Sequence, residues 1–129
     1  MTHADHSAMS ILTRACDPAT AQHAAQAIPP CIGNPEYVAA TSDDDFINQL
    51  RSREWSVVFF APGACRFSAR GAAIPGGNEK TAGWSLDQYR TLAKRTQGEH
   101  VEIVEAMHEA ETIELLAAAL TQARTTNPK

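Results

Sequence analysis

The chain lacks a long apolar run, a strong charge of one sign and a regular cysteine pattern, and each absence excludes a class of protein. No stretch approaches the ~20 consecutive apolar residues that a membrane-spanning helix needs. The net charge is only −4, so the composition favours neither nucleic acid nor an anionic membrane as a partner. Three irregularly spaced cysteines do not make a disulfide framework, and we expect free thiols in a reducing compartment.

The start of the chain also lacks a secretory signal, because no basic segment is followed there by an apolar one. We therefore expect a cytoplasmic protein. No spacing among the histidines and cysteines matches a zinc module, so neither a metal nor a cofactor is predicted. With 129 residues, 43% of them hydrophobic, the chain is long enough to bury a core of its own.

Residues 1–36 differ from the rest in being rich in Ala, His, Thr and Pro. Their only adjacent large aliphatic residues are Ile11 and Leu12. The pair Asp17-Pro18 is typical of a helix cap and first turn, and it predicts a short helix over 19–28 that ends at two prolines. Such a helix has little apolar surface to bury. We interpret 1–36 as a partly ordered N-terminal arm rather than a second domain.

Residues 37–129 alternate between strand and helix patterns and form the predicted α/β domain. Apolar runs predict strands at 37–40, 55–61 and 101–104, and helices are predicted after Ser42, after Ser85 and from about Glu109 to Arg124. This alternation implies a short parallel sheet in a small three-layer domain. Three strands make a narrow sheet. Either the arm adds a strand or cover, or two chains associate as a homodimer.

Three consecutive aspartates, Asp43 to Asp45, open the helix after Ser42. A group of carboxylates suggests a metal site. A solvated and well-capped helix start explains them better, because the helix dipole favours carboxylates in the first turn.

The long loop over 62–84 is the predicted working surface. It follows the strand at 55–61 and holds five glycines and two prolines in 23 residues. Ligands of open α/β sheets bind beyond the carboxyl ends of the strands, and loops of this length are usually functional or disordered. Three basic residues against one acidic residue make it locally positive, which suits an anion. The candidate binding residues are Asn78, Lys80, Trp84 and Ser85.

The segment from Thr41 to Cys65 carries an acidic helix start, a buried strand ending in Phe60-Ala61-Pro62, and then a cysteine. In this order it resembles the start of thioredoxin-like proteins, and the predicted elements from Tyr37 to Arg124 follow the same strand–helix order. The resemblance implies a thioredoxin-like fold and a reactive thiol at Cys65. Ser68 stands where the family has its second cysteine, so this site cannot form an intramolecular dithiol couple.

The leading hypothesis is a thioredoxin-like thiol protein of unknown substrate. Cys65 would be its reactive group, Arg66 and Arg70 would stabilise the thiolate, and Ser68 would donate a hydrogen bond to it. The Cys-x4-Arg spacing also looks like the active loop of rhodanese-type sulfurtransferases. The alternative is a non-catalytic domain that binds a small molecule, an anion or a protein through 62–84. Whether the protein is an enzyme stays open at this point.

Overall fold

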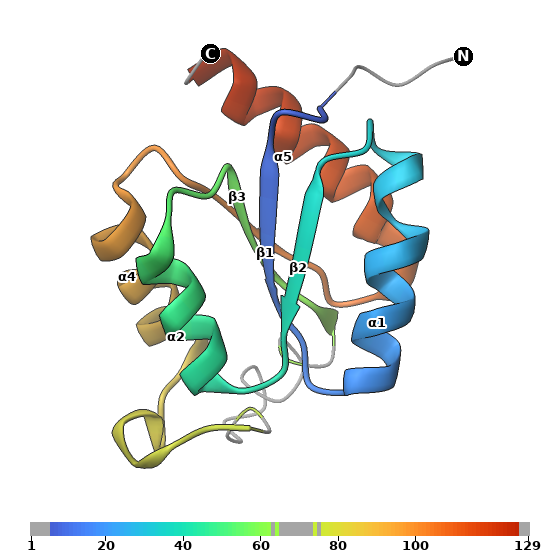
Figure 1. Cartoon of the computed structure of the whole chain (residues 1–129). Helices are drawn as coiled ribbons and strands as arrows, with labels where there is room; N and C mark the ends of the chain where they lie inside the picture. The colour runs from blue at the N-terminus through green and yellow to red at the C-terminus, as the bar shows by residue number, and fades with distance from the viewer. Residues whose placement is uncertain (1–5, 63, 65–73, 75, 127–129) are drawn as a thin grey trace.

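A computed structural model of the chain describes residues 6–62, 64, 74 and 76–126, with the backbone alone for 124–126. A four-stranded parallel sheet is covered by helices on both faces (Figure 1), which confirms the predicted three-layer α/β class. The elements in chain order are β1 (Ser10–Arg14), α1 (Pro18–Ala27), β2 (Glu36–Ala40), α2 (Asp43–Ser52), β3 (Val57–Phe60), α4 (Leu86–Gln97), β4 (Glu102–Glu105) and α5 (Thr112–Thr126), with short 3-10 turns at Pro29–Cys31, Glu79–Thr81 and Glu109–Glu111.

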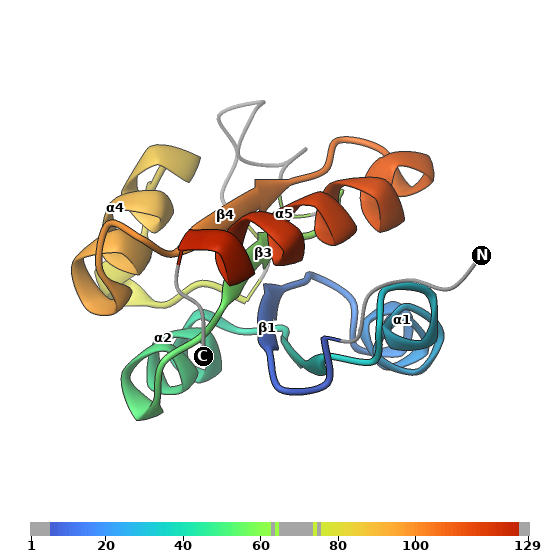
Figure 2. The ribbon, with the colours of Figure 1, turned by 90° about the horizontal axis from the view of Figure 1, so that it is seen from above.

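The strand order is β2-β1-β3-β4, and every neighbouring pair is parallel. Helices α1 and α5 lie on one face of the sheet, and α2 and α4 lie on the other (Figure 2). The chain leaves β1 through α1 toward one edge of the sheet, and it leaves β3 toward the other edge through α4. The neighbouring strands β1 and β3 thus send the chain to opposite faces. This is the topological switch point of a doubly wound sheet.

An interior strand, β1, comes from the segment interpreted above as a partly ordered arm. It lies between β2 and β3, where Ile11 pairs with Val57 and Leu12 pairs with Val58. Ile11 and Leu12 are both fully buried. Of the two ways to widen the narrow sheet, the structure shows the first: the arm supplies both a strand and a covering helix. The sequence pattern was too short to reveal this, because β1 has only two large apolar residues and its burial depends on partners far along the chain.

Side chains alternate along β3 because successive residues of a strand point to opposite faces. Val58 and Phe60 pack toward α2 and α4, whereas Val57 and Phe59 pack toward α5. All four are at most 1% exposed. Burying each such side chain stabilises the fold by about 1.5–3 kcal/mol. The unbroken apolar run in the sequence therefore reflects a strand that is covered on both faces.

The serine caps predicted from the sequence are confirmed. At the start of α2, the Ser42 hydroxyl accepts a hydrogen bond from the Asp45 backbone N–H at 3.2 Å. At the start of α4, the Ser85 backbone N–H donates to the Gln88 side chain at 2.9 Å, as in a capping box. These bonds satisfy backbone groups that helix starts otherwise leave unpaired, and they fix where each helix begins.

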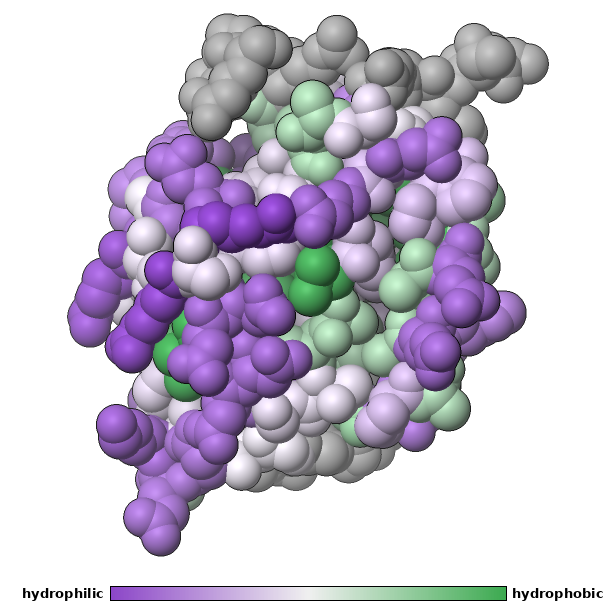
Figure 3. Space-filling view, viewed as in Figure 1, coloured by the Kyte–Doolittle hydropathy of each residue, from purple (hydrophilic) through white to green (hydrophobic). Residues whose placement is uncertain are grey.

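Figure 3 shows the face of the molecule on which β2 forms the edge of the sheet. Hydrophilic residues cover much of the flanking surface, and less polar residues gather in the middle. Val38 and Ala39 of β2 are half-buried, so the apolar edge strand is partly shielded by its surroundings.

Candidate functional site

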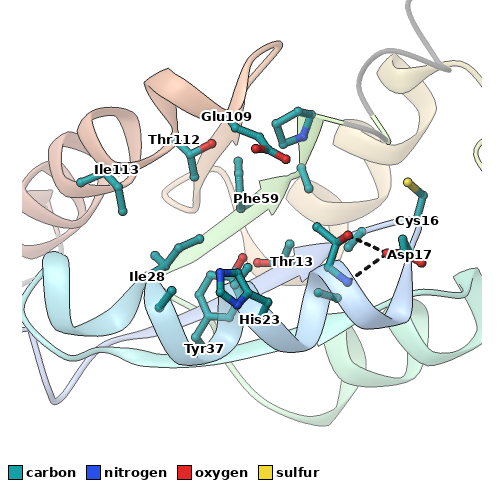
Figure 4. Close-up of a pocket in the computed structure, with 17 residues that line it drawn as sticks. Thr13, Cys16, Asp17, His23, Ile28, Tyr37, Phe59, Glu109, Thr112 and Ile113 are labelled. Carbon is teal, nitrogen blue, oxygen red and sulfur yellow. Dashed lines mark hydrogen bonds between the residues drawn. The ribbon is translucent and has the colours of Figure 1, made fainter.

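A pocket of about 350 Å³ opens at the carboxyl ends of β1 and β3, on the face covered by α1 and α5 (Figure 4). Its volume lies within the range of small-molecule sites, which is about 300–1,000 Å³. The residues that follow the two strands, Ala15 to Asp17 and Ala61 to Pro62, contribute to its wall. The pocket therefore occupies the switch point, where open α/β sheets bind their ligands. We name it the switch-point pocket.

The pocket exists because α1 carries small side chains toward the sheet. Ala21, Ala24 and Ala27 line it at a spacing of three residues. Their methyl groups fill little of the space between helix and sheet, which a stripe of leucines would have closed. The low apolar content of this helix, which suggested weak order from the sequence, is thus the cause of a cavity.

Thr13 and Phe59 belong to the sheet side of the pocket, where they are register partners on β1 and β3 and are each 1% exposed. The Thr13 hydroxyl has no hydrogen bond of standard geometry to any described residue. The Tyr37 phenol lies close to it. Burial raises the pKa of Tyr37, and the nearby Thr13 hydroxyl opposes part of that rise without a well-aligned bond. An unpartnered buried polar atom costs about 1–3 kcal/mol, which a ligand atom bonded to Thr13 would recover.

The polar part of the pocket carries two carboxylates. Asp17 caps α1, because its Oδ2 accepts from the Thr20 hydroxyl at 2.6 Å and from the Thr20 backbone N–H at 2.9 Å. These two bonds lower the pKa of Asp17. Glu109 lies across the pocket at the turn before α5 (Figure 4), and its carboxylate has no hydrogen bond or ion pair within the described chain.

The described pocket lining contains no lysine or arginine. Its titratable groups besides the two carboxylates are the exposed His23 imidazole, the Tyr37 phenol and the Cys16 thiol. The charge that these side chains place around the pocket is therefore negative, which favours cations and disfavours anions.

A second polar cluster lies on the opposite face of the sheet. The Arg14 Nε donates to Asp43 Oδ1 at 2.8 Å, and the Tyr89 hydroxyl donates to Asp43 Oδ2 at 2.7 Å. Arg14 and Asp43 are 0% exposed and Tyr89 is 2% exposed. Burial, followed by the bond to Asp43 and its charge, raises the pKa of Tyr89. This buried network ties the end of β1 to the starts of α2 and α4.

The network corrects the interpretation of the three aspartates. A solvated helix start describes Asp44 and Asp45, which are exposed, but it is wrong for Asp43. The alternative of a metal site finds no cluster to support it: across the described ranges, no three His, Cys, Asp or Glu side chains are grouped as metal ligands.

The four binding residues predicted in the long loop and directly after it lie near α2 and α4, away from the switch-point pocket. The Asn78 side chain donates to Asp44 at 2.6 Å, and the Trp84 ring packs edge-on against Tyr89 with centroids 5.2 Å apart. Ser85 caps α4, and Lys80 is exposed. Three of the four thus have contacts within the fold, and the structure does not bring them together with the pocket.

The predicted thiol site, Cys65, Arg66, Ser68 and Arg70, lies outside the described residues. Ala64, which directly precedes it, is fully buried. The two described cysteines, Cys16 and Cys31, are free thiols. Cys16 lines the switch-point pocket, and Cys31 is exposed.

Sequence reasoning missed the pocket because most of its lining belongs to the segment from Thr13 to Tyr37, nearly all of which was interpreted as an arm. One feature of the sequence did point to the pocket. The apolar pair Ile11-Leu12 is followed, after a short turn, by the helix cap Asp17-Pro18. This is a strand–turn–helix pattern, and such turns lie at the carboxyl edge of a sheet, where ligands bind.

Comparisons with known proteins found no relative of the chain. No protein-family model, no curated protein and no solved structure matches the chain. Within the described part of the chain, the helices are too short or too polar to cross a membrane.

Proposed function

We propose that this protein is a small-molecule-binding α/β domain whose ligand occupies the switch-point pocket. One observation carries the proposal: the cavity lies where the neighbouring strands β1 and β3 send the chain to opposite faces of the sheet. Fold geometry and cavity position thus point to the same place.

The start of α1 argues against a phosphate or nucleotide in this pocket. The turn between β1 and α1 reads Ala15-Cys16-Asp17 and contains no glycine that would allow a phosphate close to the backbone. The Asp17 carboxylate already occupies the N-terminus of α1 through Thr20. A second anion there would meet a like charge, so the ligand is of another kind.

A thermal-shift screen of chemically mixed small molecules tests this proposal with two variants of α1. Ala24 lines the pocket, whereas Ala25 does not. Ala24→Leu should fill the cavity and abolish the stabilisation by any hit, and Ala25→Leu should leave it unchanged. Equal loss in both variants, or hits that survive Ala24→Leu, would place the ligand elsewhere. A screen without hits on the wild-type protein would count against small-molecule binding itself.

Thiol chemistry at the same edge of the sheet is a second candidate, with Cys65 as the reactive group and a reducing compartment as its setting. Its support is the place of the thiols in the chain. Cys16 follows β1 by two residues, and Cys65 follows the neighbouring strand β3 by five. Cys65 would attack a substrate disulfide as a thiolate, form a mixed disulfide and release the other sulfur as a thiolate, which takes up a proton from water.

The rate of iodoacetamide alkylation at each cysteine, followed by mass spectrometry across the acidic to mildly basic range, tests the thiol candidate. Fast reaction of Cys65 below the ordinary thiol pKa of about 8.5 supports it. Exposed Cys31 serves as the internal control. A Cys65 that reacts no faster than Cys31 would remove the thiol candidate and leave the binding proposal intact.

A further inference from the structure

Two polar side chains of the switch-point pocket make no hydrogen bond of standard geometry to a described residue, and they come from different layers of the fold. The Thr13 hydroxyl lies on the sheet, in a residue that is 1% exposed, and the nearby Tyr37 phenol makes no well-aligned bond to it. The Glu109 carboxylate lies in the turn before α5, where it is exposed and makes no bond to a described residue. Its neighbour Glu111 differs, because that carboxylate accepts from the Met107 backbone N–H at 2.7 Å.

These two groups set different requirements on a ligand. A buried hydroxyl without a partner is satisfied by a polar ligand atom that donates or accepts a hydrogen bond. The Glu109 carboxylate is exposed to solvent, and it attracts a cation because the pocket lining described here offers it no lysine or arginine. Phe59 lies between Thr13 and Glu109, and Ile113 adds apolar surface to one side of the same pocket (Figure 4).

We infer that the ligand of the switch-point pocket is a small amine. Its protonated nitrogen binds Glu109, its apolar body packs between α1, Phe59 and Ile113, and a second polar group bonds to Thr13. The inference rests on the proposed function. It also specifies which ligands the pocket rejects: carboxylates and phosphates of the same size meet Asp17 and Glu109 as like charges.

A matched set of probes separates these requirements. Tyramine carries an ammonium and a phenol, tyrosol replaces the ammonium by a hydroxyl, 4-hydroxyphenylacetate replaces it by a carboxylate, and phenethylamine lacks the phenol. In amide NMR titrations, tyramine should have the smallest dissociation constant of the four probes and 4-hydroxyphenylacetate the largest. We expect a difference of at least roughly tenfold between these two, as for one charge-assisted contact.

Two variants assign the contacts. Glu109→Gln should raise the dissociation constants of tyramine and phenethylamine by roughly tenfold and leave that of tyrosol unchanged. Glu114 is exposed and lies outside the pocket, so Glu114→Gln should leave the dissociation constants of all four probes unchanged. Thr13→Val keeps the shape of the side chain but removes its hydroxyl. It should weaken the binding of tyramine severalfold and leave the binding of phenethylamine unchanged.

The inference fails if the carboxylate probe binds this pocket as tightly as tyramine, if Glu109→Gln has no effect, or if none of the four probes binds. The first two results would leave a small-molecule pocket of different chemistry. The third would overturn the amine, and the wider screen with Ala24→Leu would then decide separately whether the pocket binds anything.

Discussion

Arg14 and Asp43 form a fully buried ion pair, with Nε and Oδ1 2.8 Å apart, although 29 positions separate them in the sequence. The pair joins the last residue of β1 to the first residue of α2. The second oxygen of Asp43 accepts from Tyr89 of α4 at 2.7 Å. The carboxylate thus holds three elements together on the face of the sheet opposite the switch-point pocket.

Asp43→Asn should destabilise the protein by about 3–5 kcal/mol, because it leaves the Arg14 guanidinium buried without a counter-charge. Denaturant unfolding followed by circular dichroism measures this loss. Asp45→Asn is the matched control in the same helical turn, and since Asp45 is exposed we expect a change below about 1 kcal/mol. Equal effects of the two substitutions would show that the buried pair contributes nothing specific.

The chain's two tyrosines, Tyr37 and Tyr89, should both resist ionisation in the folded protein. Burial is the main cause that raises both pKa values, and the Asp43 carboxylate adds to the effect at Tyr89. An unfolded tyrosine loses its proton near pH 10, so the unfolded state releases protons first. The contribution of the two tyrosines to the free energy of unfolding should therefore be constant below about pH 10, and the free energy of unfolding should fall above that pH.

An alkaline titration of tyrosinate absorbance checks this prediction. The absorbance should rise together with unfolding detected by circular dichroism. In Tyr89→Phe the free energy of unfolding should fall less steeply above about pH 10, because only Tyr37 then releases a proton on unfolding. Ionisation of both tyrosines near pH 10 in a protein that stays folded would contradict the described burial.

Much of the fold could be predicted from local sequence, and the reason is visible in particular residues. β3 stands out because both of its faces are buried, which yields the apolar run around Val57 to Phe60. Ser42 and Ser85 mark helix starts because capping depends on residues only three positions away. Such signals are contained within a short window of sequence.

The interior strand and the pocket were not predictable in the same way. Arg14 is fully buried beside Asp43, which neutralises and bonds it and which in turn accepts a hydrogen bond from Tyr89. The residues around Arg14 in the sequence do not indicate these distant partners. The pocket combines Thr13 with Glu109, which only the complete strand order brings into the lining of one cavity. Predicted site residues in 65–70 lie outside the described residues, so their roles stay predictions.

Gly76 and Gly83 offer a matched test of loop packing, since both have a positive φ, at +87° and +78°. A Cβ at Gly76 would lie 2.3 Å from the Thr41 carbonyl oxygen, whereas one at Gly83 meets nothing within 4 Å. Both alanine variants bear the backbone strain of about 1–3 kcal/mol, but Gly76→Ala also bears the clash. Urea unfolding should therefore rank Gly76→Ala clearly below Gly83→Ala in stability. The reverse order would mean that the Gly76 segment does not pack on Thr41.

Gln97 should contribute far more to the stability of the fold than a glutamine at the end of a helix normally does. Its amide nitrogen donates to the Leu50 and Arg53 carbonyls at 2.7 and 2.9 Å, and its oxygen accepts from the Trp55 N–H at 2.6 Å. Gln97→Ala leaves these backbone groups unpaired and should cost about 2–4 kcal/mol. Exposed Gln22 of α1 is the control, and hydrogen exchange at the Trp55 amide should speed up only in the Gln97 variant.

The switch-point pocket should bind a small molecule. Mapping the changes in amide NMR shifts on adding the tightest probe or screening hit tests this most directly. We predict the largest shifts at Cys16, Thr20, Ala24 and Thr112, all of which line the pocket, and their disappearance in Ala24→Leu. Shifts confined to the groove along the edge strand β4, around Lys94 and Ile103, or no saturable shifts with any compound, would contradict it.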